Sequence, residues 1–339
     1  MVTDVIILAG GKGTRLAPLT DSLPKPLLPV GNIPTLSHIL RAVEKAGLRR
    51  ATITVAYQKE AIIKRYGGIF RTVKLNYATE EKPLGTAGAV KAAVLPAGYS
   101  TDQYGDRLTD EGDILVLSGD ALFEGDLARF IQSHEQSGAD VTIAAKYFNN
   151  VTGYGVMVGS SSRIERFVEK PSPQETPSHT VNIGIYLLSR RVLCEIPDGF
   201  YDFGKDLFPA LLQKGYRLGY TLFDDYWCDI GTLESYLAAN LRASDGKSVI
   251  GSHCIIPQSA HIESSVLMNH VTLGENTSVC HSILSSTVTV KDGVTLFHNV
   301  VGEGCQITQT PSPYTILSMH EGECKITPIL SKEPLLAKT

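Results

Sequence analysis

The sequence predicts an α/β fold in which a doubly wound, mostly parallel sheet is followed by a short left-handed hexapeptide β-helix. Over about the first 240 residues, short apolar runs alternate with stretches of helical pattern, an order typical of doubly wound sheets. After about residue 247, aliphatic residues recur at six-residue intervals, which indicates a hexapeptide β-helix. A chain of 339 residues is long enough for a large domain and a smaller one. We expect these at 1–246 and 247–310, with a tail at 311–339.

The alternation can be followed element by element. Strands are expected at 5–9, 52–56, 73–78, 114–120 and 141–147. Helices are expected at 36–46, 59–66 and 87–95, and a polar surface loop at 101–112. Ligands of such sheets bind at the carboxyl ends of the strands. The segment 10–15 and Asp120 both lie at such carboxyl ends, so we expect them to share one site.

The six-residue pattern of the C-terminal part is interrupted. It runs through Ile250, Ile256, Ile262, Leu273, Val279, Val290, Leu296, Val301 and Ile307, with breaks at 263–272 and 280–289. A small antiparallel β domain is the alternative interpretation. The same region contains His253, His261, His270, His281 and His298. Their spacing matches no metal-ligand pattern, so we expect them to be polar turn residues.

Composition and charge exclude several classes of function. The formal net charge is −4 with 19% charged residues, and no basic arm suggests a nucleic-acid partner. No apolar stretch approaches the ~20 residues that a membrane helix needs, and the N-terminus lacks the basic region of a signal peptide. The six cysteines form no C-x-x-C pair, which argues against a disulfide framework or a zinc site and fits the reducing cytoplasm.

The N-terminal strand runs into a glycine-rich segment with basic residues. Gly10, Gly11 and Gly13 are followed by Thr14 and Arg15, and Lys25 comes soon after. Glycines let backbone N–H groups approach an anion closely, and cationic side chains add the charge that a triphosphate needs. The dinucleotide-binding pattern G-x-G-x-x-G is absent because its third glycine would fall at Leu16. The segment therefore predicts a phosphate-binding loop of another kind.

Six motifs recur in order along most of residues 1–240. They are GGKGTRLAPLT…PKPLLPV, PLGTAGA (83–89), LSGD (117–120), VEKP (168–171), NIGIY (182–186) and WCDIGT (227–232). Together they resemble the sugar-1-phosphate nucleotidyltransferases, or nucleotide-diphospho-sugar pyrophosphorylases. The GTAGA segment is most similar to the branch of mannose- and heptose-1-phosphate guanylyltransferases. The resemblance implies a Rossmann-like nucleotidyltransferase domain over 1–246.

The resemblance also implies the catalytic roles. Arg15 is expected to hold the triphosphate and the leaving pyrophosphate, and Lys25 to contact the phosphates during transfer. Asp120 and Asp229 are expected to hold Mg²⁺, for which two carboxylates are a usual protein ligand set. For Asp229, the alternative role is an N-cap, because Gly231-Thr232-Leu233-Glu234 is able to open a helix.

The substrate-binding residues follow from the other motifs. Glu81 has the acceptor oxygens that guanine N1–H and its 2-amino group need, whereas a pair of solvated charges at Glu80 and Glu81 is the alternative. The expected nucleotide-binding residues are Leu8, Gly10, Gly11, Gly13, Thr14, Glu81, Pro83, Gly85, Thr86 and Gly88. Those expected to bind the sugar phosphate are Tyr154, Gly155, Glu169, Lys170 and Asn182, although Glu169 and Lys170 also suit a surface ion pair.

Two functional hypotheses follow. The first is an enzyme that converts an NTP and a sugar 1-phosphate into an NDP-sugar and pyrophosphate, with Mg²⁺ as cofactor. GTP is the favoured nucleotide and mannose, heptose or octose 1-phosphate the acceptor; a thymidylyl-, uridylyl- or adenylyltransferase is the alternative within the family. The second is a non-catalytic subunit that senses nucleotide sugars. In either case the flat faces and open end of a β-helix favour a homo-oligomer.

Overall fold

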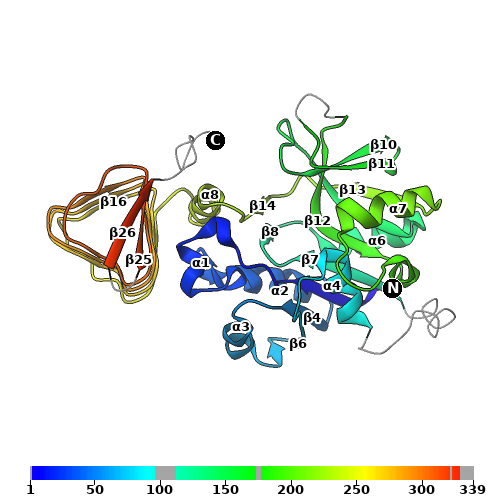
Figure 1. Ribbon diagram of the computed structural model, residues 1–339, viewed down its shortest axis with the longest axis horizontal. Helices are drawn as coiled ribbons and strands as arrows, with labels where there is room; N and C mark the ends of the chain where they lie inside the picture. Colours follow the sequence, from blue (N-terminus) through cyan, green and yellow to red (C-terminus); the bar gives the residue numbers. More distant parts are fainter. Residues whose placement is uncertain (1, 96–111, 173–176, 321–322, 329–339) are drawn as a thin grey trace. The chain divides into compact units, whose positions relative to one another are not determined.

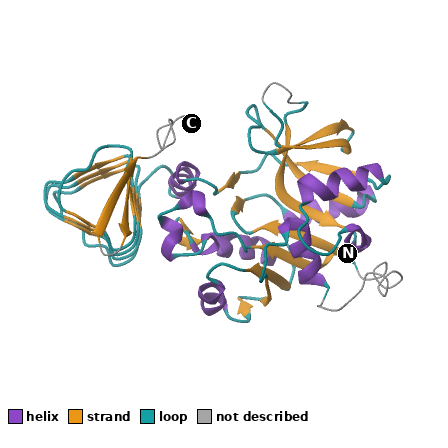
Figure 2. Cartoon of the chain, viewed as in Figure 1, coloured by secondary structure: helices purple, strands orange, loops and turns teal. Residues whose placement is uncertain are grey.

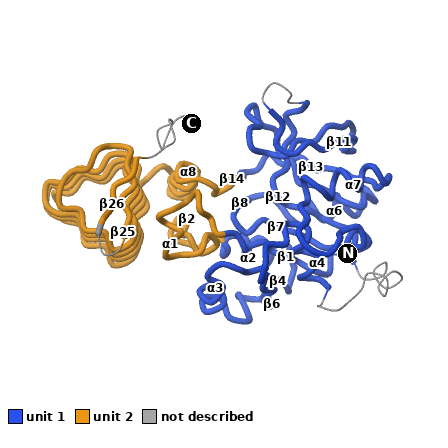
Figure 3. Tube along the Cα trace, viewed as in Figure 1, with its two compact units in different colours: residues 1–11, 36–227 blue, residues 12–35, 228–339 orange. Residues whose placement is uncertain are grey.

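The computed structural model describes residues 2–95, 112–172, 177–320 and 323–328 (Figure 1). Most of the loop predicted at 101–112 lies outside these residues. The chain divides into two compact units (Figure 3), unit 1 with residues 1–11 and 36–227 and unit 2 with residues 12–35 and 228–339. The glycine-rich segment is therefore split between the units after Gly11. Within the described ranges, every helix is too short or too polar to cross a bilayer.

Unit 1 is built on a ten-stranded mixed sheet in the order β10-β11-β13-β9-β12-β7-β1-β4-β6-β5 (Figure 2). The strands β5, β11 and β12 run against the direction of the others. The sheet is therefore mostly parallel, as predicted, and each predicted strand is present. In chain order the strands are β1 (Val2–Leu8), β4 (Arg50–Val55), β5 (Ile69–Phe70), β6 (Val73–Thr79), β7 (Asp113–Ser118), β9 (Val141–Tyr147), β10 (Gly155–Ser160), β11 (Arg163–Glu169), β12 (Thr180–Leu188) and β13 (Leu218–Leu222).

Helices cover both faces of this sheet. Successive side chains of a strand point to opposite faces, and in β7 Ile114 and Val116 pack in one core cluster with Ala87 of α4 (Gly85–Val94). Leu117 lies on the other face, where it shares a small cavity with Ile39 of α2 (Thr35–Lys45). The remaining helices of unit 1 are α3 (Lys59–Tyr66), α6 (Leu127–Ser137) and α7 (Phe208–Gln213). The helices predicted at 36–46, 59–66 and 87–95 are thus confirmed as α2, α3 and α4.

Unit 2 begins with residues 12–35, which α8 (Leu233–Ala243) holds in place. Tyr236 is fully buried and its hydroxyl donates to the carbonyl of Pro29 at 2.7 Å. The amide oxygen of Asn240 accepts from the backbone N–H of Gly31 at 3.1 Å. The short elements of this segment are η1 (Thr14–Leu16), α1 (Leu19–Ser22), η2 (Lys25–Leu27), β2 (Pro29–Val30) and β3 (Ile33–Pro34). The 12–35 segment is thereby packed as part of the fold of unit 2.

The rest of unit 2 is a three-sided parallel β-helix (Figure 1). Its three sheets follow the orders β15-β17-β20-β23-β25-β26, β16-β19-β22 and β18-β21-β24. Only the last pair, β25 with β26, is antiparallel among the described pairings of these sheets. The antiparallel β domain considered from the sequence is therefore excluded. The strands are β15 (Val249–Ile250), β16 (His261–Glu263), β17 (Val266–Leu267), β18 (Thr272–Leu273), β19 (Ser278–Cys280), β20 (Ile283–Leu284), β21 (Thr289–Val290), β22 (Thr295–Phe297), β23 (Val300–Val301), β24 (Gln306–Ile307), β25 (Thr315–His320) and β26 (Glu323–Pro328).

The strand register explains the breaks in the six-residue pattern. Ile250 pairs with Leu267, Leu267 with Leu284 and Leu284 with Val301, so each turn takes seventeen residues. Two sides of a turn take six residues and the third takes five. The parallel ladder continues past residue 310, because Val300 pairs with Ile316 in β25.

Polar side chains form a buried ladder along one corner of the β-helix. The hydroxyl oxygen of Ser248 accepts from the N–H of Ser265, that of Ser265 from Ser282, and that of Ser282 from Asn299. Ser265, Ser282 and Asn299 are fully buried. Each side chain thus satisfies a backbone donor of the next turn, which a buried corner needs because unpaired N–H groups are costly there.

The histidines of this region take two different positions. Those at 253, 270, 281 and 298 have positive φ and occupy corners, as predicted. Their rings stack in pairs, with centroids 4.9 Å apart for His281 and His298. Burial, with His281 nearby, lowers the pKa of His298. His261 differs from the prediction because it lies in strand β16.

Candidate functional site

The carboxyl ends of β1 and β7 bring two predicted site residues to one edge of the unit 1 sheet. Leu8 and Ser118 are register partners in adjacent parallel strands, and Gly10 and Asp120 each follow two residues later. Gly119 makes this approach possible, because its N–H donates to the carbonyl of Leu8 at 2.8 Å and a Cβ would lie 2.4 Å from that oxygen. The predicted placement of both at one edge is thus observed for the unit 1 residues.

Asp120 is tied to the next strand of the sheet through Ser118. The Ser118 hydroxyl donates to Oδ1 of Asp120. A Cβ on Gly184 of β12 would lie 3.2 Å from Cβ of Ser118, and the positive φ of 77° at Gly184 also favours glycine. Asn182 accepts from the N–H of Gly184 through its amide oxygen and donates to the hydroxyl of Tyr186. The predicted metal ligand and the predicted sugar ligand Asn182 thus belong to one hydrogen-bonded region.

Glu169 lies in a slot that two glycines leave open. A Cβ on Gly155 would lie 2.7 Å from Oε2 of Glu169, and one on Gly204 only 2.3 Å from it. Burial raises the pKa of Glu169; the charge of Lys170 opposes this effect, and the nearby carboxylate of Asp202 adds to it. A half-buried carboxylate of this kind is a strong hydrogen-bond acceptor for sugar hydroxyls.

Lys170 and Tyr154 lie next to this slot. The ammonium of Lys170 is 3.7 Å from Oε1 of Glu169, and the lysine side chain is mostly exposed. The two residues therefore form the ion pair that was considered as an alternative to sugar-phosphate binding. The N–H of Lys170 donates to the carbonyl of Tyr154, and φ of Lys170 is 50°. A lysine in this backbone region is uncommon and is often found at functional sites. The Tyr154 ring stacks on Phe148 and meets Trp227 edge-on.

The predicted base-binding loop packs against residues 199–203. Backbone N–H groups of Ala87 and Gly88 donate to the carbonyl of Tyr201. A Cβ on Gly85 would lie 2.6 Å from that oxygen, and one on Gly88 would lie 2.5 Å from the carbonyl of Gly199. Gly85 and Gly88 were both expected to bind the nucleotide. In the structure, these two glycines let the loop pack closely against the backbone carbonyls of Gly199 and Tyr201.

The side chains of this loop differ in their surroundings. Thr86 donates to a carboxylate oxygen of Asp202 at 3.0 Å and accepts from the N–H of Phe203. Glu81 and Pro83 are exposed. Glu80 is placed differently from Glu81, because a Cβ on Gly10 would lie 2.7 Å from Oε1 of Glu80. The carboxylate of Glu80 therefore lies close to Gly10, just after the end of β1.

In unit 2, the predicted phosphate and metal residues gather around Gly231. Nζ of Lys25 is 3.8 Å from Oδ1 of Asp229. A Cβ on Gly231 would lie 2.7 Å from Oδ2 of Asp229 and 3.1 Å from Nη2 of Arg15. The helix α8 is capped by Thr232, whose hydroxyl accepts from the N–H of Ser235. Asp229 is therefore not the N-cap, and that alternative for its role is wrong.

The phosphate loop itself is held by tight contacts. Gly13 has φ of 67°, and a Cβ there would lie 3.1 Å from Cβ of Lys25 and from Cγ2 of Thr20. Thr20 donates to the carbonyl of Gly13 at 2.9 Å. Thr14 and Arg15, both exposed, open the short helix η1 that follows. Two cationic side chains, the exposed Arg15 and the buried Lys25, therefore lie beside the carboxylate of Asp229.

Four residues of this region were missed by the sequence interpretation. Ser118, Asp202 and Gly204 act through the contacts given above. Ser118 belongs to the LSGD motif, and Asp202 and Gly204 belong to the sequence DFGKD at 202–206. The fourth is Trp227, whose indole Nε1 is buried and has no hydrogen-bond partner among the described residues. Buried indole N–H groups usually have a partner, so this donor marks a place for one.

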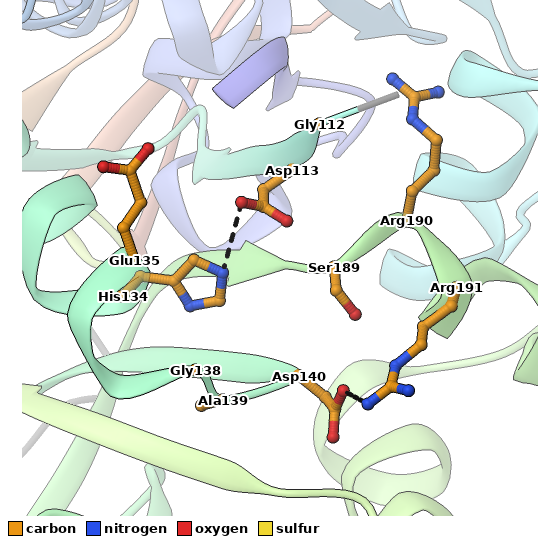
Figure 4. A pocket seen from close by; sticks show the side chains of 10 residues that line it. All are labelled: Gly112, Asp113, His134, Glu135, Gly138, Ala139, Asp140, Ser189, Arg190 and Arg191. Carbon is orange, nitrogen blue, oxygen red and sulfur yellow. Dashed lines mark hydrogen bonds and ion pairs between the residues drawn. The ribbon is translucent and has the colours of Figure 1, made fainter. Parts of the chain in front are cut away.

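A separate cavity lies at the opposite ends of the unit 1 strands (Figure 4). It has a volume of about 440 Å³, and Asp113 at the start of β7 and Asp140 before β9 line it. Asp140 pairs with Arg191 across it. Burial acts to raise the pKa of Asp113, but the hydrogen bond and charge of His134 outweigh it and lower that pKa. The cavity contains none of the predicted site residues.

Two family models match overlapping parts of the chain. A family model described as nucleotidyl transferase matches residues 4–246, and one described as GlmU-like, C-terminal hexapeptide matches residues 236–312. A mannose-1-phosphate guanylyltransferase of Mycobacterium tuberculosis is 33% identical over 238 residues, which are 69% of this chain and 62% of that protein. The D-glycero-alpha-D-manno-heptose 1-phosphate guanylyltransferase of Aneurinibacillus thermoaerophilus is 32% identical over 70% of this chain and 96% of that protein.

Solved structures show the same relationship. The crystal structure of HddC from Yersinia pseudotuberculosis complexed with GMP-PN superposes with a TM-score of 0.57 at 26% identity, covering 70% of this chain and 98% of that one. A putative glucose-1-phosphate thymidylyltransferase from Bacillus anthracis superposes with a TM-score of 0.61 at 24% identity, covering 71% of this chain and 95% of that one. The second likeness concerns the fold alone.

Proposed function

The chain belongs to the nucleotidyl transferase family, and we propose that it transfers a nucleotidyl group from GTP to a sugar 1-phosphate, releasing pyrophosphate. The observation that carries this proposal is the cluster of Arg15, Lys25 and Asp229 around Gly231 in unit 2. Relatives named as guanylyltransferases support it. The chain matches 62% of the length of the first of these relatives, so the activity is proposed for this chain on its own residues.

Nucleotidyl transfer between two anionic substrates needs positive charges that are fixed in place. An oxygen of the sugar phosphate attacks the α-phosphorus of the triphosphate and pyrophosphate leaves in line, so two anions meet and negative charge shifts to the leaving group. Arg15 is exposed and has five N–H donors, which suits the departing phosphates. Lys25 is buried and held near Asp229, so its charge stays in place as the reaction proceeds. The attacking phosphate is already an anion and needs no strong general base.

We propose Mg²⁺ as the cofactor, with Asp120 and Asp229 as its protein ligands. Carboxylate oxygens are the donors that Mg²⁺ prefers, and one or two of them are usual where phosphates complete the shell. Asp229 is about one-third exposed and Asp120 is half-buried, so neither is closed off from a hydrated ion. The ion would supply charge neutralisation on the phosphate oxygens.

Guanine is the proposed base. The names of the relatives and the GMP-PN complex of a neighbour favour it. Glu81 is exposed at the end of β6 and is the proposed acceptor for guanine N1–H and the 2-amino group. The backbone of residues 85–88, fixed against Tyr201, gives the base a rigid edge.

The proposed sugar-phosphate site lies around Glu169. Glu169 accepts from sugar hydroxyls, Asn182 donates or accepts, and Lys170 pairs with the phosphate. Trp227 adds an indole N–H that has no partner among the residues described, and we assign it to an oxygen of the sugar phosphate. Mannose and heptose 1-phosphates are the acceptors that the names of the relatives favour, and an octose 1-phosphate is a further proposed acceptor.

Two further features complete the proposal. The β-helix is proposed to support a homo-oligomer, because its first turn leaves Ile255 65% exposed. A truncation after residue 246 is then expected to lower the number of subunits per particle, which light scattering measures.

The enzyme is proposed to work in the cytoplasm, where its cysteines stay reduced.

The experiment that tests the function is a substrate panel. Purified protein with Mg²⁺ is given GTP, ATP, CTP, UTP or dTTP with each of several sugar 1-phosphates, and pyrophosphate and NDP-sugar are measured. Product with GTP alone supports the proposal. Product with dTTP or UTP overturns the assignment of the base to Glu81. Nucleotide binding without product across the panel contradicts catalysis and favours a sensing subunit.

A further inference from the structure

Three metal-binding side chains meet on the outer surface of the β-helix, away from the residues assigned above. His261 and Glu263 lie in β16 and Cys280 lies in β19. One potential ligand atom from each, an imidazole nitrogen, a carboxylate oxygen and a thiol sulfur, lies within 4.8 Å of the others. Sequence spacing does not reveal this cluster, because Cys280 comes from the next turn of the β-helix.

The β-helix fixes this arrangement through its backbone. Residues two apart in a strand point to the same face, which places the side chains of His261 and Glu263 together. Glu263 and Cys280 are register partners in adjacent parallel strands, which lie about 4.8 Å apart. The N–H of His261 donates to Thr277 and that of His281 donates to Glu263, so both strands are held on either side of the cluster.

The distance between the histidine and glutamate donors suits a tetrahedral ion. Nitrogen and oxygen ligands of zinc lie about 2.0–2.2 Å from the metal, which puts two such donors about 3.4 Å apart at tetrahedral angles. Nε2 of His261 is 3.4 Å from Oε2 of Glu263. Cys280 is partly exposed, and its sulfur is 3.5 Å from the hydroxyl of Ser278 in a weak contact.

We propose that His261, Glu263 and Cys280 form a binding site for Zn²⁺ or a similar transition-metal ion. The mixed nitrogen, oxygen and sulfur donors select such an ion over Mg²⁺ or Ca²⁺, which prefer oxygen alone. The thiol of Cys280 releases one proton when it binds, and His261 binds as neutral imidazole. Water completes the fourth position, since His261 and Glu263 are both more than half exposed. The bound ion links two successive turns of the β-helix.

Cobalt is the probe that tests this site. Metal-free, reduced full-length protein is titrated with Co²⁺, and a thiolate-to-cobalt charge-transfer band is expected in the near ultraviolet, lost on addition of one equivalent of Zn²⁺. Cys280→Ser is expected to abolish the band. His261→Ala and Glu263→Gln are each expected to weaken binding by at least about tenfold, because even residues outside the ligand set cost that much at metal sites.

Cys254→Ser is the matched control, since Cys254 is another partly exposed cysteine of the same β-helix and should leave the band unchanged. Circular dichroism checks that each variant keeps its fold. A second readout is thermal unfolding, in which Zn²⁺ should raise the Tm of the natural protein but not of Cys280→Ser. Absence of the band at millimolar Co²⁺, or its persistence in Cys280→Ser, overturns the proposal whatever the result of the substrate panel.

Discussion

Nζ of Lys25 lies 3.8 Å from Oδ1 of Asp229, although more than 200 residues separate them in the sequence. The lysine side chain is 8% exposed and the aspartate side chain 34%. Lysines are rarely buried unless they are paired. The carboxylate therefore pairs with a buried ammonium beside the phosphate loop, while its own side chain is more open to solvent. This contact links the PKP and WCDIGT motifs in one place.

Loss of the buried charge should impair catalysis. Lys25→Met keeps the length and apolar stem of the side chain but removes the ammonium. We expect kcat/KM to fall by at least about 100-fold, as for other fixed groups that stabilise transition-state charge. Steady-state pyrophosphate release measures this. Lys12→Met, at an exposed position of the same segment, should change kcat/KM far less, and equal losses in both variants would argue against a specific role for Lys25.

Gly231 should be required for its small size. A methyl group there meets Asp229 and Arg15 at 2.7 and 3.1 Å, so Gly231→Ala should displace both side chains. We expect activity to fall about 10–100-fold, since small misplacements of reacting groups are costly, with little change in Tm. Gly68→Ala is the control, because nothing lies within 4 Å of a Cβ at that position. A fully active Gly231→Ala variant would contradict the importance of this cluster.

Glu169 should make stability depend on pH. Burial raises its pKa in the folded protein, so the folded state holds the proton more tightly than the unfolded state does. Stability from this group is therefore present below the ordinary glutamate value of about 4.3 and is lost as pH rises through the folded pKa. Glu169→Gln removes this loss. The Tm of the variant relative to the natural protein should be higher at neutral pH than at about pH 4, and a difference that does not change with pH would contradict the assignment.

The core of the β-helix should be sensitive to cavities. Leu284 is fully buried in the middle turn, and Leu284→Ala should lower the free energy of unfolding by about 2–5 kcal/mol. Ile326→Ala, at a residue 58% exposed in the last strand β26, should change it by less than about 0.5 kcal/mol. Chemical denaturation measures both. Similar effects at the two sites would mean that Leu284 is not part of a packed core.

The α/β part could be predicted closely because each element has its own local pattern. The run at 114–120 and the helix at 36–46 have the apolar spacing of their final structure, and β7 and α2 follow it. Strand order was not predictable in the same way. The antiparallel insertion of β12 between β7 and β9 depends on long-range pairing, which no local pattern reports.

The β-helix was predicted from its six-residue intervals, but the reason for the breaks was not. One side of each turn has five residues, and only the pairing of Ile250, Leu267, Leu284 and Val301 makes this visible. In the candidate site, the motif residues could be proposed from the sequence because their side chains carry charges or hydrogen-bonding groups. Residues such as Ser118 and Gly204 were missed because their role lies in which neighbour they touch.

Replacing Asp120 tests whether its carboxylate holds the metal ion of the proposed transfer reaction. Asp120→Ala is compared with the natural protein for pyrophosphate release from GTP and mannose 1-phosphate in Mg²⁺, with Asp225→Asn as a control on the surface of unit 1. We expect Asp120→Ala to lose activity by at least about 100-fold and Asp225→Asn to keep it. Substantial turnover by Asp120→Ala, on the substrates that the natural protein uses, would contradict the assignment of the metal and of the site.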